Sequence, residues 1–208
     1  MIIGRTNIFA EVRSNNTLLT KQKYFYISHL TRDFIIYNKI SSLPVNLNSI
    51  LKFNKWKVIS YSKLKNMNIV EYESVMKTNH GFVELTPDGD YIIFYNDELP
   101  RCVQRFTIAH EIGHIVLHHF KVPIENREQE ANMFAARLLM PMCVLHECKI
   151  KSEQELIDLC DVSCVSAHYR YERLVMLENR NKFYVDCNEE VLKSKFKDFI
   201  NEYLKNKV

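Results

Sequence analysis

The chain has 208 residues, 47% of them hydrophobic and 25% charged, and a formal net charge of only +3. This length fits one or two average domains, and the apolar content is ample for a buried core. The basic residues are spread along the chain, so composition does not favour a protein that contacts nucleic acid directly. We expect a single compact domain by default.

The N-terminal residues and the cysteines bear on the compartment. Charged residues Arg5, Glu11 and Arg13 interrupt the first twenty residues, so this stretch lacks the apolar run of a signal peptide. No later stretch approaches eighteen apolar residues, the length that a membrane span needs. We therefore expect a cytoplasmic protein without a membrane partner. Its six cysteines are expected to be reduced, mostly buried thiols: Cys102, Cys143, Cys148, Cys160, Cys164 and Cys187.

The first quarter of the chain predicts one long helix and two shorter elements. Residues 1–20 fit either a short hairpin, turning at Asn15 and Asn16, or a loosely docked arm. Apolar residues recur at helical spacing from Lys23 to about Ile40. A short helix over 46–53 and a strand over 55–61 follow. We assign residues 1–42 to an N-terminal arm and helix.

The central part of the chain predicts a hairpin followed by two helices. Two β-rich runs, 81–85 and 91–95, flank a segment with strong turn chemistry around Pro87 and Gly89. A helical pattern then runs from Val103 to about His119, and a second one from about Asn126 to Met140. We assign residues 43–145 to one core.

The last third of the chain predicts helices only. Ser152 opens a helix with a capping-box signature, and Ser163 caps another that reaches Leu177, so residues 146–180 resemble a helix-turn-helix. Residues 181–208 contain one amphipathic helix from about Glu189 to Leu204. The whole chain is thus an α+β protein, mainly helical, with a small antiparallel sheet or hairpin.

The string His110-Glu111-Ile112-Gly113-His114 carries the chemistry. Histidines four residues apart on a helix project from one face and can share a metal, each at about 2.0–2.1 Å from zinc. Glu111 is rotated by about 100° along the helix, so it is placed to act on a water molecule rather than as a ligand. The sequence therefore predicts a zinc site with Glu111 as general base.

A catalytic zinc needs a third protein ligand, and three nearby glutamates are available, Glu125, Glu128 and Glu130. On a helical projection Glu128 lies roughly 50° from the centre of the apolar face and Glu130 roughly 110° away. Glu128 is therefore the preferred third ligand. Asn132, four residues later, is placed to hydrogen-bond the outer nitrogen of a ligand histidine, and the alternative reading is an exposed polar residue.

Two further histidines, His118 and His119, are less suited as ligands. His118 continues the face of His110 and His114, where one helix cannot wrap three side chains tightly around one ion. Neither Cys143 with Cys148 nor Cys160 with Cys164 has the two-residue spacing of a structural zinc site. We expect one catalytic ion.

Two blocks, RFTIAHEIGH at 105–114 and EQEANMFAARLLMP at 128–141, resemble the ImmA/IrrE zinc metallopeptidases. The resemblance extends weakly to Leu43–Val45 and to Tyr169–Arg170, and covers about two thirds of the chain. It implies a zincin-like core and the zinc ligands His110, His114 and Glu128. It also implies regulated proteolysis of a helix-turn-helix repressor, which switches on stress or mobile-element genes.

Several roles stay open at this point. Tyr169, Arg170 and His168 are candidate donors to the transition state, with ordinary surface or packing roles as the alternative. Gly113 fits either close approach of substrate or tight helix packing. The alternative function is a zinc-stabilised interaction protein that displaces a repressor without cutting it. A DNA-binding role for 152–177 is disfavoured by its five acids, Glu153, Glu155, Asp158, Asp161 and Glu172.

Overall fold

The computed structural model describes residues 2–3, 19–67, 72–120, 126–180 and 187–207. The turn expected at Asn15 and Asn16, and the candidate ligand Glu125, lie outside these residues. The chain forms two compact units, residues 1–28 with 47–135 and residues 29–46 with 136–208. The division into four segments that we expect from sequence stays a prediction.

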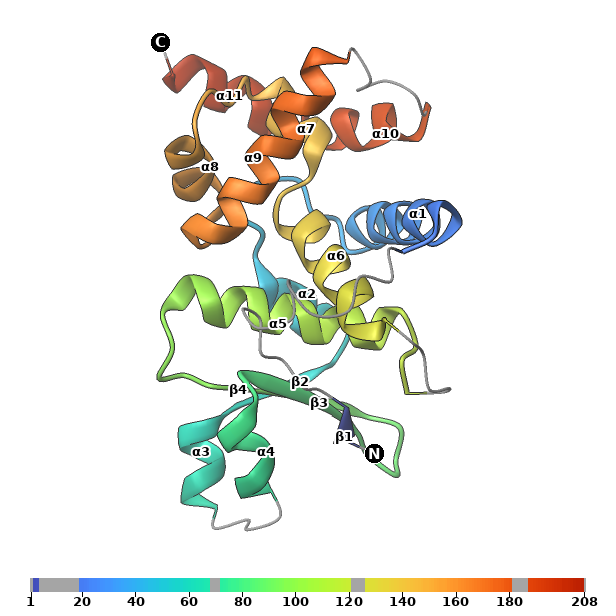
Figure 1. Ribbon diagram of the computed structural model, residues 1–208, viewed down its shortest axis with the longest axis vertical. Coiled ribbons are helices and arrows are strands. Elements are labelled where there is room, and N and C mark those ends of the chain that lie inside the picture. The colour runs from blue at the N-terminus through green and yellow to red at the C-terminus, as the bar shows by residue number, and fades with distance from the viewer. Residues whose placement is uncertain (1, 4–18, 68–71, 121–125, 181–186, 208) are drawn as a thin grey trace. The chain divides into compact units, whose positions relative to one another are not determined.

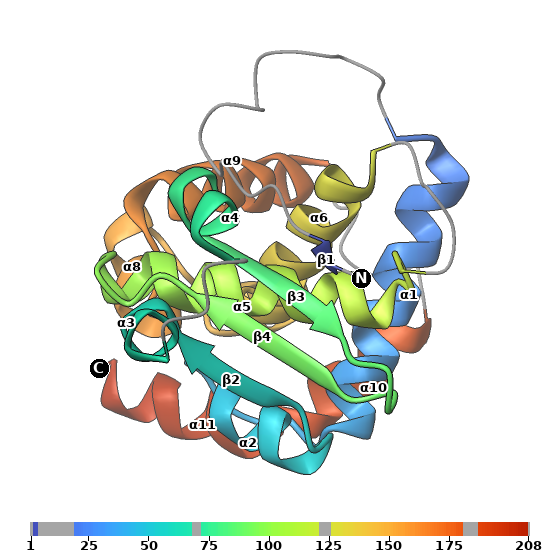
Figure 2. The ribbon, with the colours of Figure 1, turned by 90° about the horizontal axis from the view of Figure 1, so that it is seen from below.

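The first unit is built on a four-stranded sheet of order β1-β3-β4-β2 (Figures 1 and 2). The β3–β4 hairpin is antiparallel, as predicted, and β1 pairs antiparallel with β3. The sheet is mixed rather than antiparallel throughout, because β2 runs parallel to β4. The strands are β1 (Ile2–Ile3), β2 (Lys57–Ser60), β3 (Gly81–Leu85) and β4 (Tyr91–Tyr95).

Helices cover both faces of this sheet. Helix α5 (Arg101–Val116) packs on one face, together with α2 (Leu47–Phe53). On the opposite face, α3 (Tyr61–Asn66) and α4 (Glu73–Thr78) cover an aromatic cluster in which Phe82 stacks on Phe94 at 4.6 Å (Figure 1). Val83 and Ile93 alternate with these rings and are fully buried. The sheet thus supports α5 through contacts with β3 and β4.

Two longer helices each begin in the first unit and end in the second, α1 (Lys21–Tyr37) and α6 (Arg127–Leu139). Both agree with the predicted helices to within three residues. Helix α5 ends at Val116, three residues before the predicted end. The physical reason is the left-handed backbone of His118, with φ of 56°, which cannot continue a helix.

The second unit is helical. It contains α7 (Met142–Glu147), α8 (Glu153–Cys160), α9 (Cys164–Asn179), α10 (Cys187–Lys195) and α11 (Lys197–Asn206). Ser152 and Ser163 cap α8 and α9 through their side chains, as predicted. The single C-terminal helix expected from sequence was wrong, because the chain breaks into α10 and α11 at the fully buried Phe196.

None of the cysteines with described side chains forms a disulfide, and Cys143, Cys148 and Cys160 are buried thiols as expected. Burial raises the pKa of Cys143 and of Cys148 to about 12. Across the described residues, no helix has both the length and the apolar character needed to cross a membrane.

Candidate metal centre

Helix α5 presents two histidines from one face because they are four residues apart. Its other faces are used for packing. Ala109, Ile112 and Ile115 are buried in the first unit. His110 and His114 are one helical turn apart, and both have no exposed surface. Burying two imidazoles is costly unless their nitrogens have partners, so the question is what those nitrogens face.

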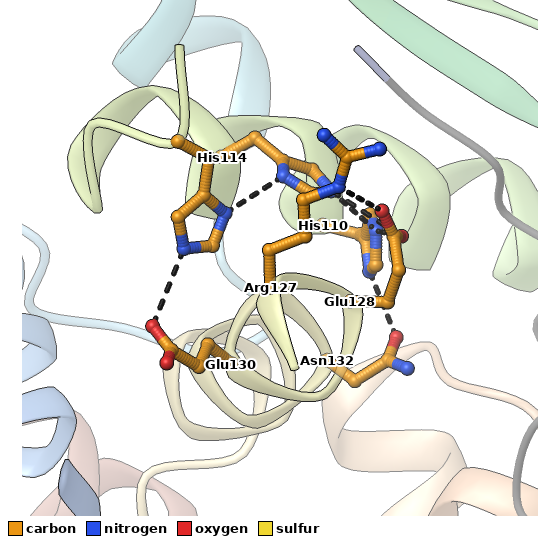
Figure 3. Close-up of polar contacts among 7 residues, drawn as sticks. His110, His114, Arg127, Glu128, Glu130 and Asn132 are labelled. Carbon is orange, nitrogen blue, oxygen red and sulfur yellow. Dashed lines mark hydrogen bonds and ion pairs between the residues drawn. The ribbon is translucent and has the colours of Figure 1, made fainter. Parts of the chain in front are cut away.

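The inner nitrogens of both histidines meet one carboxylate oxygen of α6. The Nε2 atoms of His110 and His114 are 2.9 Å apart, and Glu128 Oε2 lies 3.2 Å from the first and 3.5 Å from the second (Figure 3). Tetrahedral zinc with ligands at about 2.0–2.2 Å would separate its ligand atoms by about 3.4 Å. The triangle is therefore close in size to one face of a tetrahedral coordination shell.

The outer contacts decide which ring nitrogens carry hydrogen. His110 Nδ1 lies 2.8 Å from Asn132 Oδ1, which accepts only, so Nδ1 carries a hydrogen, and in the neutral ring Nε2 presents a lone pair. That lone pair faces His114 Nε2 at 2.9 Å and a carboxylate, an arrangement that a shared cation would stabilise. Asn132 thus has the supporting position predicted from sequence.

A buried carboxylate oxygen points to the same conclusion. Glu128 Oε1 is buried and accepts no hydrogen bond from any described residue. Arg127 Nε lies 3.3 Å away as an ion pair (Figure 3). The buried cluster of His110, His114 and Glu128 is compatible with a metal site, since its ligand atoms all lie within 4.8 Å of one another.

The local charges set the protonation of this cluster. Burial lowers the pKa of His114 to about 4, and the nearby Glu128 partly opposes this shift. For Glu128, burial opposes ionisation, but the close contacts with His110 and His114 outweigh it and lower the pKa. For His110, burial lowers the pKa, but the contact with Glu128 and the charge of Glu111 outweigh it and raise the pKa. The carboxylate is thus ionised and His114 neutral, the forms that bind metals, whereas a proton is favoured on His110 and a metal would have to displace it.

Glu111 lies on the sheet side of α5 and has no exposed surface. A Cβ atom added at Gly81, the first residue of β3, would be 3.6 Å from Glu111 Oε1 and 2.8 Å from the Phe94 carbonyl oxygen. Burial raises the pKa of Tyr61, and the negative charge of Glu111 adds to this shift. The carboxylate therefore sits in a tightly packed, buried environment on the helix that carries the histidine pair.

Gly113 is explained by helix packing. A Cβ atom added there would lie 3.2 Å from the Cα and the carbonyl oxygen of Ala131 on α6. The absence of a side chain lets α6 approach α5 closely, and this approach brings Glu128 to the histidines. Of the two explanations that sequence left open, the structure supports packing.

The polar surroundings of His114 were missed by sequence reasoning. His119 Nδ1 lies 2.8 Å from His114 Nδ1, on the side of the ring away from Glu128. Glu130 contacts His119 and also Lys23, which lies more than 100 residues earlier in the chain. The helical projection kept Glu130 away from the ligand position, but nothing in the spacing indicated Lys23. His118 is exposed.

The three candidate donors, His168, Tyr169 and Arg170, lie on α9 in the second unit. His168 pairs with Glu153 at 2.8 Å on the surface, and Tyr169 is 56% exposed. Arg170 donates from Nε and Nη2 to the Met140 carbonyl oxygen, at 2.8 and 2.6 Å. Each side chain therefore has a surface or packing role within its own unit, and a role in catalysis stays a prediction.

Comparison with known proteins agrees with this geometry. No curated protein matches the chain. The model of a peptidase family, described as the IrrE N-terminal-like domain, matches residues 65–172, just over half of the chain. The matched range contains α5, α6 and the His110, His114, Glu128 cluster. It supports a peptidase-type function, and the chain belongs to the IrrE N-terminal-like peptidase family, M78.

Proposed function

We propose that the chain is a zinc-dependent endopeptidase that cleaves one specific protein, such as a helix-turn-helix transcriptional repressor. The observation that carries the proposal is the buried triangle of His110 Nε2, His114 Nε2 and Glu128 Oε2, with sides of 2.9, 3.2 and 3.5 Å. Two imidazoles and one carboxylate suit zinc, and they leave coordination positions open as a catalytic site requires.

Glu111 has the central chemical role in this proposal. Bound zinc would polarise the peptide carbonyl and lower the pKa of a water molecule toward about 7. Glu111 would take the proton of that water while the water oxygen attacks the carbonyl carbon, and would then give the proton to the leaving amine nitrogen. Its full burial strengthens both the attraction for the proton and the field at the reacting bond.

Asn132 and Arg127 hold the ligands rather than the substrate. Asn132 fixes the ring of His110 with Nε2 turned inward, and Arg127 faces Glu128 Oε1 while Oε2 faces the histidines. The repressor substrate rests on the resemblance to metallopeptidases of this kind. The cytoplasmic compartment is part of the same proposal.

The test compares zinc content and cleavage in wild type, Glu111→Gln and Glu128→Gln, each co-expressed with candidate repressors. We expect Glu111→Gln to keep zinc but to cleave at least about 100-fold more slowly, because the general base is lost. Glu128→Gln should lose zinc and cleavage together. Glu98→Gln, which removes an exposed carboxylate paired with Lys65, is the control and should match wild type.

The opposite pattern would favour an interaction protein. If wild type and both variants bind zinc equally and none cleaves, Glu128 is not a ligand and Glu111 is not a base. A repressor that is released from DNA by intact, non-cleaving protein would then support displacement without hydrolysis.

A further inference from the structure

A line of buried polar contacts runs outward from His114. His114 Nδ1 lies 2.8 Å from His119 Nδ1, and His119 Nε2 lies 3.3 Å from Glu130 Oε2. The other oxygen of that carboxylate, Oε1, lies 2.7 Å from Lys23 Nζ. The side chains of His119 and Glu130 are 0% and 2% exposed, whereas Lys23 is 42% exposed. The line therefore connects the metal cluster with the surface. It begins on α5 and the turn after it, passes through α6 and ends on α1.

Each hydrogen in this line has one direction that is consistent with metal binding. His114 Nε2 belongs to the ligand triangle, so it must present a lone pair, and Nδ1 must carry the hydrogen. His119 Nδ1 then accepts, and its Nε2 donates to the Glu130 carboxylate, which only accepts. Lys23, which only donates, completes the line.

The backbone places His119 for this contact. His118 adopts the left-handed conformation, and the His119 amide donates to the His114 carbonyl oxygen at 3.1 Å. This turn after α5 folds the chain back, so that of two adjacent histidines one is exposed and the other lies against His114. His118 and His119 can therefore be substituted in parallel, with the exposed His118 as the control for the buried His119.

We propose that His119 and Glu130 are positioning residues, which hold His114 in the tautomer and ring orientation that bind the metal, while Lys23 only occupies the other oxygen of Glu130. This inference rests on the proposed metal site. Contacts of this outer kind typically change metal affinity by about 10- to 100-fold when they are removed. The important property is the direction of the hydrogen bonds, and a merely structural role would not depend on it.

The test reverses that direction without changing side-chain size. In Glu130→Gln, the Lys23 ammonium keeps the amide oxygen, so the amide NH₂ faces His119 Nε2. His119 must then carry its hydrogen on Nδ1, facing the hydrogen of His114. We expect zinc affinity, measured by chelator competition at fixed pH, to fall about 10- to 100-fold.

A second substitution should restore what the first removes. In Glu130→Gln with Lys23→Met, the amide can rotate and offer its oxygen to His119, so most of the lost affinity should return. Lys23→Met alone keeps the carboxylate and should bind zinc nearly as wild type does. His119→Gln, which can accept from His114 and donate to Glu130, should retain more affinity than His119→Phe.

Controls separate this inference from the proposed function. His118→Asn changes an exposed neighbour, and asparagine tolerates its φ of 56°, so zinc affinity should stay unchanged. Circular dichroism of the metal-free proteins checks folding, and the Co²⁺ absorption spectrum reports ligand geometry independently of cleavage.

Two results would overturn the inference alone, and a third would overturn it together with the proposed function. Wild-type affinity in Glu130→Gln, or a double variant as weak as the single one, would show that hydrogen-bond direction does not matter, and would leave the metal site intact. If wild type itself bound no zinc, the proposed function would fail together with it.

Discussion

Two histidine–glutamate contacts in this protein look alike but lie in different surroundings. On α5 and α6, His110 Nε2 is 3.2 Å from Glu128, with side chains 0% and 16% exposed. On α8 and α9, His168 Nδ1 is 2.8 Å from Glu153, with side chains 49% and 43% exposed. The exposed contact is the shorter one. Distance between two atoms therefore does not identify a site, whereas convergence of several buried ligand atoms does.

The surroundings also set the charge of the histidines. Water solvates the His168 pair, and Glu153 raises the pKa of His168, so a proton is favoured on that ring. In the buried cluster, burial lowers the pKa of His114 to about 4, so its ring stays neutral and keeps a lone pair for a metal, whereas at His110 burial is outweighed by Glu128, which raises the pKa. The same two residue types thus form a surface ion pair in one unit and a candidate metal site in the other.

The largest expected effect is that of zinc on stability. A ligand at about 1,000 times its Kd adds about 4 kcal/mol to the free energy of unfolding. We expect a chelator to remove this amount from wild type and equally from His168→Gln, but to change Glu128→Gln little, as measured by urea unfolding. Equal chelator effects in wild type and Glu128→Gln, with none in His168→Gln, would assign the metal to the exposed cluster.

Arg170 provides an intermediate effect on the α9 side of the comparison. Arg170→Met removes two charge-assisted hydrogen bonds to Met140, so we expect a loss of about 1–3 kcal/mol in the free energy of unfolding and unchanged zinc affinity. Tyr169→Ala, at an exposed neighbour, should stay within about 0.5 kcal/mol of wild type. Unchanged stability with slower cleavage in Arg170→Met would instead make Arg170 a transition-state donor.

The smallest effect is the pH dependence of the exposed pair. The pKa of His168 is raised in the folded state, so the contact with Glu153 stabilises the fold below the unfolded pKa, about 6.5. This contribution disappears as pH rises through the folded pKa. NMR titration of the His168 ring should show a pKa above 6.5 in wild type and a lower one in Glu153→Gln. Identical values in both proteins would mean that the two side chains do not interact in solution.

Sequence patterns predicted the long elements well because each has a strong local signal. The hairpin of β3 and β4 is confirmed residue for residue, since turn chemistry and β-rich runs specify it. Helices α3, α4 and α7, of six residues each, were not predicted. Helices so short are not stable alone, and they form because the rest of the protein packs against them.

The ligand cluster was also accessible from sequence, because its spacing is local. His110 and His114 are related by one helical turn, and the phase of α6 favoured Glu128 over Glu130. The break at Phe196 was not accessible, because the apolar pattern continues through it and only its burial between α10 and α11 shows the change.

The sequence by itself determined the helices that carry the cluster of His110, His114 and Glu128, and it predicted that these residues bind a metal and that Glu111 acts as a base. Only the tertiary structure decided that Gly113 lets α6 approach α5, that β2 runs parallel to β4, and that Lys23 reaches Glu130. The physical reason is the range of the interactions. Helical periodicity acts within a few residues, whereas packing and hydrogen-bond direction depend on side chains that are distant in the chain.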